Sequence, residues 1–158
     1  GLAPGFMAMH FMLYDSVFHG INDSYQIWWA LSALLIPVFS ALRLAKFNID
    51  ARQTTSFIGL PVPANALFWI GICQAGLQIE NKACGYVIVC LVILFSFLLI
   101  SEIPMFSLKF KNLKLKENYL RYLILIAAAI FLIFFGLAGL AATIGLYIIL
   151  SLLTAKKH

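Results

Sequence analysis

The residues best suited to bind an anion are grouped in the segment Leu42-Arg-Leu-Ala-Lys-Phe-Asn48. If this segment is helical, Arg43, Lys46 and Phe47 occupy positions i, i+3 and i+4 and share one face of the helix. Two cations beside an aromatic ring can bind a carboxylate or a phosphate, and arginine adds a planar, bidentate pair of donors. The alternative is that both cations only extend from the end of an apolar helix toward water. The pattern by itself leaves both interpretations open.

A second segment with unusual backbone chemistry is Phe57-Ile-Gly-Leu-Pro-Val-Pro-Ala64. Gly59 permits a positive φ or a close approach of another backbone, and Pro61 suits the first turn of a helix. The segment is either the plain start of a helix or a re-entrant segment that lines a substrate site. The residues do not decide between these two interpretations.

No complete catalytic motif accompanies these segments. The sequence contains no P-loop, G-x-S-x-G, H-E-x-x-H or G-x-G-x-x-G pattern. Asp50 and Glu102 have no second carboxylate at the spacing of a metal site. We therefore predict no catalytic residue and no metal ligand within these 158 residues.

The composition requires that these segments be positioned in a membrane. Of the 158 residues, 63% are apolar and only 11% are charged, whereas soluble domains are about half apolar and about a quarter charged. There is too little polar surface to enclose a water-soluble core. An ordinary cytosolic enzyme, a disordered chain and a secreted disulfide scaffold are excluded, and an integral membrane protein remains.

The uncharged stretches predict an all-α, polytopic transmembrane helical bundle that forms a single membrane domain over residues 1–158. A span needs about 20 apolar residues. The uncharged stretch Tyr122–Ala155 has 34 residues, about 51 Å of helix, so we divide it into two helices at Gly136-Leu-Ala-Gly139. The prediction is one partial and five full spans, near residues 1–14, 25–45, 61–79, 83–101, 119–135 and 137–153.

The basic residues predict the orientation of this bundle. With these spans, ten of the 11 Lys and Arg residues fall on one side, which the positive-inside rule assigns to the cytoplasm. They are Arg43, Lys46, Arg52, Lys109, Lys111, Lys114, Lys116, Arg121, Lys156 and Lys157. The basic charge therefore indicates topology and attraction to anionic membrane lipids, and we expect no nucleic-acid partner.

The two segments singled out above resemble a known signature. Ala41-Leu-Arg-Leu-Ala-Lys-Phe-Asn48, followed by Phe57–Ala64, is similar to the ALRLARFN…FxGLPxPA pattern of the bacterial phosphatidylserine synthases, in the CDP-alcohol phosphatidyltransferase superfamily. Gly1–Pro4 and Pro104–Lys111 resemble further segments of that family in the same order. Lys46 stands where the family usually has arginine, so the charge is kept but the bidentate geometry is lost.

The resemblance implies a membrane enzyme of phospholipid biosynthesis. CDP-diacylglycerol and L-serine would react to give phosphatidylserine and CMP, at the cytoplasmic face of the bacterial inner membrane, in a homodimer. It also implies a divalent metal ion, Mg²⁺ or Mn²⁺, bound by the aspartates of the superfamily motif D-x2-D-G-x2-A-R-x8-G-x3-D-x3-D. That motif would lie upstream of Gly1, so we expect the chain to be the C-terminal portion of such an enzyme and to be inactive by itself.

The resemblance also ranks the candidate site residues. Arg43 and Lys46 become the leading candidates for binding the serine carboxylate or a substrate phosphate, together with Phe47, Gly59 and Pro61. One alternative is another CDP-alcohol phosphatidyltransferase, with glycerol phosphate or inositol as acceptor. The other is a small multi-pass transporter subunit.

Overall fold

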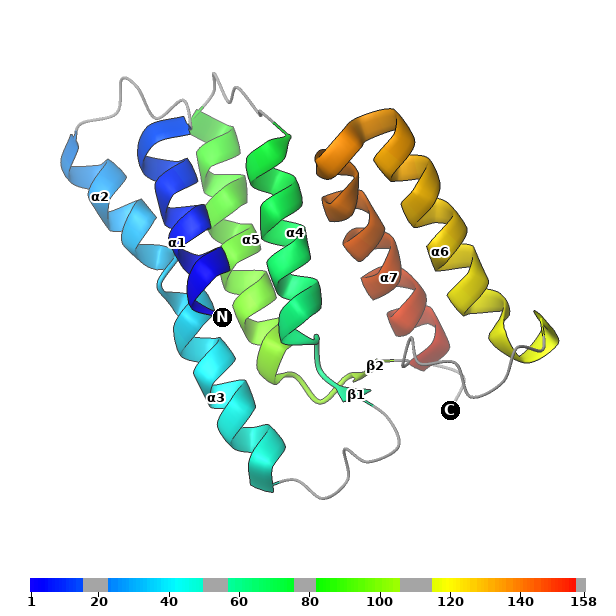
Figure 1. The fold of residues 1–158 in the computed structure, drawn as a ribbon. Helices are drawn as coiled ribbons and strands as arrows, with labels where there is room; N and C mark the ends of the chain where they lie inside the picture. Colours follow the sequence, from blue (N-terminus) through cyan, green and yellow to red (C-terminus); the bar gives the residue numbers. More distant parts are fainter. Residues whose placement is uncertain (16–22, 50–56, 76–81, 106–114, 156–158) are drawn as a thin grey trace.

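The computed structural model describes residues 1–15, 23–49, 57–75, 82–105 and 115–155 as a bundle of helices (Figure 1). The predicted all-helical class is confirmed. The helices are α1 (Leu2–His10), the π-helix η1 (Phe11–Asp15), α2 (Asp23–Ser32), α3 (Leu35–Ile49), α4 (Val62–Gln74), α5 (Lys82–Ile100), α6 (Leu115–Phe135), the 3-10 helix η3 (Gly136–Ala138) and α7 (Gly139–Ala155). Two short strands, β1 (Phe57–Ile58) and β2 (Pro104–Met105), pair antiparallel and were not expected from the sequence.

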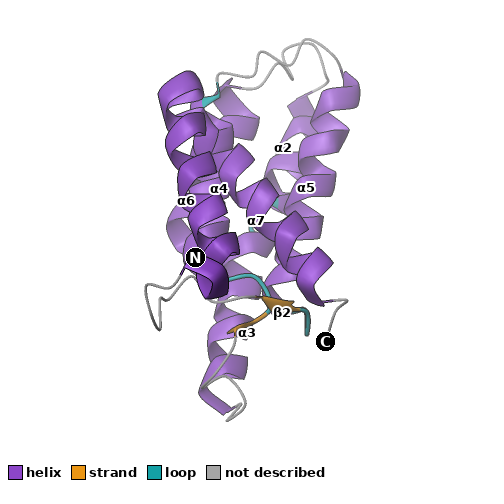
Figure 2. Ribbon diagram, turned by 90° about the vertical axis from the view of Figure 1, so that its right-hand side faces the viewer, coloured by secondary structure: helices purple, strands orange, loops and turns teal. Residues whose placement is uncertain are grey.

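The bundle has two parts that meet at α4. The helices α1 to α5 form one group, and α6 and α7 form an antiparallel hairpin beside it (Figure 1). α7 packs against α4, α3 against α5, and α1 against α4. The two strands lie at one end of the bundle, near the end of α5 and the start of α4 (Figure 2).

A glycine turn closes the hairpin, as predicted. α6 ends at Phe135, and Gly136 adopts a positive φ of 56° before η3 and α7 reverse the chain direction. Glycine adopts this backbone conformation without the steric cost that other residues meet. The predicted division of the long apolar stretch at Gly136–Gly139 is therefore confirmed.

Each predicted span contains a helix, but the count of six membrane spans is not confirmed. Within the part of the chain that the structure describes, two stretches are long and apolar enough to cross a membrane: Ile27–Ile49 and Asn118–Thr154, the second of which includes the hairpin turn. The helix α4 has 13 residues, about 20 Å, which is shorter than a hydrocarbon core of about 30 Å. The range expected for this span continued to residue 79, and residues 76–81 lie outside the described part of the chain.

The predicted span near 25–45 consists of two helices with a turn between them, and the apolar stretch Ile27–Ile49 that includes this turn is long enough to cross a membrane. α2 ends at Ser32 and α3 begins at Leu35, and Ile36 N–H donates to Ala33 O at 3.1 Å in a tighter, i to i−3 turn. Pro37 explains the break. Its ring clashes with the carbonyl four residues earlier, and it has no N–H to donate.

Three aromatic rings on α4 and α5 form part of the core of the bundle. Phe68 stacks on Phe95 with ring centroids 3.9 Å apart, and Trp69 meets Phe95 edge to face at 6.3 Å. All three side chains are buried. These contacts fix α4 beside α5 and so hold the start of α4 close to the end of α5, where the candidate site lies.

Candidate functional site

The candidate site is built on the C-terminal end of α5. The last four carbonyls of a helix have no partner within it, and they form the negative end of the helix dipole. Here Leu60 N–H donates to Leu98 O at 2.9 Å. Cations from α3 bind the next two carbonyls, those of Leu99 and Ile100. The carbonyl groups at this end of α5 therefore accept hydrogen bonds from outside the helix, from α3 and from the segment that precedes α4.

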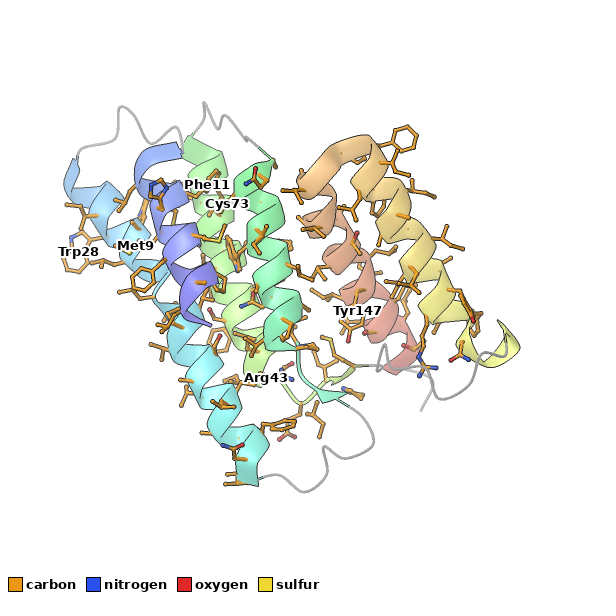
Figure 3. The ribbon with its side chains drawn as sticks, in the orientation of Figure 1. Met9, Phe11, Trp28, Arg43, Cys73 and Tyr147 are labelled. Atoms are coloured by element: carbon orange, nitrogen blue, oxygen red, sulfur yellow. The ribbon has the colours of Figure 1, made fainter. Side chains whose placement is uncertain are left out.

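Arg43 is the centre of this arrangement. It comes from α3, is 8% exposed, and its Nη1 donates to Leu60 O and, at 2.9 Å, to Leu99 O. Figure 3 shows it at the end of the bundle, where α3, α4 and α5 converge. The structure thus rules out the alternative that Arg43 simply extends to water. Both hydrogen bonds use Nη1, so within the described part of the chain Nε and Nη2 remain as donors for a ligand.

Lys46 lies one turn further along α3 and faces the same helix end. Its Nζ donates to Ile100 O at 3.3 Å and forms an ion pair with Glu102 Oε1 at 3.2 Å. The lysine side chain is 35% exposed and the glutamate side chain 69% exposed. The lysine side chain is therefore partly accessible, and its ion-pair partner is a largely exposed carboxylate.

Gly59 is required by the close packing of this region. Its φ is +74°, and a Cβ at this position would lie 2.7 Å from Ser101 O and 2.9 Å from Leu99 O. Its N–H donates to Ile103 O at 2.9 Å, which extends the pairing between β1 and β2. The predicted positive φ and close backbone approach are both confirmed.

A cleft opens beside Arg43. It has a volume of about 180 Å³ and is lined by Arg43, Leu44, Phe47, Pro61, Val62 and Pro63. Pockets for drug-sized ligands measure roughly 300–1,000 Å³, so this cleft fits a small group rather than a whole lipid. Arg43 is the one charged residue among these six and the others are apolar, an arrangement suited to one anionic group attached to an apolar molecule.

The structure brings together all five residues predicted for the site. Arg43, Phe47 and Pro61 line the cleft. Gly59 lies against Arg43, since a Cβ there would be 3.2 Å from Nη1, and Lys46 binds the adjacent helix end. Pro61 is the N-cap of α4 rather than a residue of its first turn. Substrate binding by these five residues stays a prediction.

Sequence reasoning missed several polar groups near the site. Glu102 showed no motif, yet it pairs with Lys46. Ser40, Asn65 and Ser96 are at most 6% exposed, and their side-chain polar atoms have no hydrogen-bond partner among the described residues. Ser40 precedes Arg43 by three residues in α3, Ser96 precedes Leu99 by three residues in α5, and Asn65 is in the first turn of α4, which follows Leu60. Polar side chains inside apolar helices are costly and therefore informative, so the uncharged residues of the spans could have been examined for this signal.

Tyr147 brings α7 into the same region. Its side chain is 3% exposed and near enough to Arg43 for an electrostatic interaction, and Figure 3 shows it partway along α7. The direct contacts of the guanidinium are with the end of α5 and with the segment before α4, and α7 contributes a buried tyrosine in the vicinity. Among the described residues, no three His, Cys, Asp or Glu side chains are grouped to hold a metal ion.

The sequence is similar to three curated proteins that share the name CDP-diacylglycerol--serine O-phosphatidyltransferase. The one from Helicobacter pylori is 30% identical over 94% of this chain and 59% of its own length. The one from Bacillus subtilis is 38% identical over 40% of the chain and 30% of its own length. The one from Methanocaldococcus jannaschii is 48% identical over 28% and 21%, respectively.

The predicted resemblance to the phosphatidylserine synthases is confirmed by these three relatives. No protein-family model matches the chain. The chain spans less than two thirds of the length of each relative, with 59% as the largest share.

Proposed function

We propose that the intact protein transfers the phosphatidyl group from CDP-diacylglycerol to L-serine, giving phosphatidylserine and CMP. The observation that carries the proposal is the similarity to the Helicobacter pylori protein along 94% of the chain. The geometry supports it, because a buried guanidinium, a partly accessible lysine and a small apolar cleft meet at one end of the bundle. An anionic headgroup on a lipid has this combination of properties.

In the proposed reaction the serine hydroxyl oxygen attacks the phosphorus that carries the diacylglycerol. The bond from this phosphorus to the bridging oxygen of CMP breaks, CMP leaves with the electron pair, and a carboxylate accepts the hydroxyl proton. The residues of this chain bind and orient. Arg43 and Lys46 hold the serine carboxylate or a substrate phosphate through charge-assisted hydrogen bonds. Phe47 and Pro61 form the apolar wall, and Gly59 lets the backbone approach Arg43.

We also propose, from the resemblance alone, that the reaction depends on Mg²⁺ or Mn²⁺. Such an ion would neutralise the pyrophosphate. The described residues do not fit this requirement, because they contain no group of three possible ligands. We therefore assign no step of the reaction to the metal.

The helices and the similarity to phosphatidylserine synthases indicate a membrane protein. We propose that the bundle lies in the bacterial inner membrane with six spans, of which the first is partial. The end that carries Arg43 and Lys46 would face the cytoplasm. The resemblance further suggests a homodimer.

The test is incorporation of labelled serine into lipid by membranes that contain the intact protein. We expect labelling that requires added CDP-diacylglycerol and is abolished by EDTA and restored by Mg²⁺ or Mn²⁺. Labelling from glycerol phosphate or inositol in place of serine would contradict the serine assignment. No transfer to any of the three acceptors would contradict the enzyme assignment and favour a transporter subunit.

A further inference from the structure

Glu102 occupies a position that its own charge disfavours. It follows the C-terminal end of α5 by two residues, where the helix dipole presents a partial negative charge. A second negative charge there is repelled unless a cation compensates for it. The compensating cation is Lys46, whose Nζ lies 3.2 Å from Glu102 Oε1 and 3.3 Å from Ile100 O.

The Lys46–Glu102 ion pair can be broken at low cost, so that Lys46 can bind another anion in place of Glu102. The glutamate side chain is 69% exposed, so it can leave for water without crossing a buried environment. Ion pairs between exposed side chains contribute little to stability. The hydrogen bond from Lys46 to Ile100 O keeps the ammonium in place when the carboxylate leaves.

Arg43 lies on the same face of α3, three residues before Lys46, and its Nη1 is held by two backbone carbonyls. Lys46 does not itself line the cleft, but it follows Arg43 by about one helical turn, so an anion bound at Arg43 lies one turn of α3 from the residue that carries the ammonium. Glu102 is the described carboxylate that competes for this ammonium.

We propose that the carboxylate of Glu102 competes with the anionic substrate for the ammonium of Lys46. The carboxylate neutralises Lys46 in the empty site and is displaced when a substrate oxyanion binds Lys46. The inference rests on the proposed function, since it takes the oxyanion to be the serine carboxylate or a phosphate of CDP-diacylglycerol. Glu102 thereby sets the affinity for the substrate by competition, without touching the reacting atoms.

The test measures binding, so it does not depend on turnover. The purified intact protein in phosphatidylcholine nanodiscs is titrated with L-serine in one arm and with CDP-diacylglycerol in the other. Glu102→Gln removes the competing charge, and we expect the Kd for one of the two ligands to fall by about two- to fivefold, as the small energy of an exposed ion pair allows. The ligand whose Kd falls identifies the oxyanion. The matched control Glu102→Asp keeps the negative charge and is expected to keep a Kd close to that of the wild type.

A second background separates competition from a general effect of charge. In Lys46→Met protein, Glu102→Gln should leave both Kd values unchanged, because there is no ammonium to release. An equal gain in that background would overturn the exchange, as would unchanged binding after Glu102→Gln alone. A wild-type protein that binds neither ligand would contradict the proposed function, which is a different result from binding that is insensitive to Glu102.

Discussion

Arg43 connects three segments of the bundle and also lines the cleft. Its Nη1 donates to Leu60 O and Leu99 O, which ties α3 to the start of α4 and to the end of α5. Arg43 also lines the cleft. Both carbonyls belong to fully or almost fully buried residues, so nothing else nearby satisfies them if the arginine is lost. The same side chain therefore holds the site together and offers it a positive charge.

The first prediction separates the structural role of Arg43 from its proposed role in binding an anion. Arg43→Ala leaves two buried carbonyls unpaired, at a cost of about 1–3 kcal/mol for each, and removes the cation from the cleft. We expect a lower thermal midpoint in detergent and an increase of about tenfold or more in the KM for serine or for CDP-diacylglycerol. Membrane insertion should be unaffected, because the apolar length of the helix does not change.

Arg43→Lys is the matched control. It keeps the charge and one donor group but not the planar fork, so we expect stability to be partly restored while the KM stays raised. A KM equal to that of the wild type in both variants would show that Arg43 acts only as a structural link between helices.

At the scale of helices, the hairpin α6–α7 is attached through a very close contact. A Cβ on Gly71 of α4 would lie 2.9 Å from Ala141 Cβ and 3.1 Å from Ala141 Cα, in α7. Small residues let two helix backbones approach in a membrane, where packing replaces the hydrophobic effect as the driving force. This contact also fixes α7, which carries the buried Tyr147, beside α4.

The second prediction concerns this contact. Gly71→Ala places a methyl group against backbone atoms that cannot rotate away, so α7 must shift. We expect a loss of about 1–3 kcal/mol in the free energy of unfolding, measured by denaturant titration in detergent. Gly145→Ala in α7 is the control, because its Cβ would meet nothing within 4 Å and alanine favours helix by about 1 kcal/mol. Equal effects of the two substitutions would show that the Gly71 contact is not tight.

The helices could be predicted from the sequence where their signal comes from residues that are close together in the chain. Long apolar runs marked the helical ranges, and Gly136 marked the turn of the hairpin. Pro37 carried an equally local signal for the break between α2 and α3, but an apolar run of suitable length concealed it. In the site, the shared face of Arg43 and Phe47 followed from helical spacing. The ion pair of Lys46 with Glu102 did not, because it joins residues 56 positions apart and depends on how α3 packs against α5.

At the scale of the whole molecule, the cations that satisfy helix ends lie at one end of the bundle. Arg43 and Lys46 bind the end of α5 there. At the same end, α6 begins and α7 finishes, while the hairpin turn lies at the opposite end (Figure 1). The side of the membrane that this end faces stays a prediction. Exposed apolar side chains cover α6, among them Ile133 at 80% and Phe134 at 76%, as expected for a surface in contact with lipid.

The third prediction tests this orientation with two single cysteines in a cysteine-free background. Ile49, at the end of α3, is 85% exposed, and Leu137, in the hairpin turn, is 54% exposed, so both substitutions place an accessible thiol. If the Arg43 end faces the cytoplasm, a membrane-impermeant maleimide added to intact cells should label Leu137→Cys and not Ile49→Cys. Both should react after the membrane is permeabilised, which controls for buried thiols. Labelling of Ile49→Cys in intact cells would reverse the orientation and place Arg43 and Lys46 on the side opposite to cytoplasmic serine, so the proposed reaction could not take its acceptor from the cytoplasm.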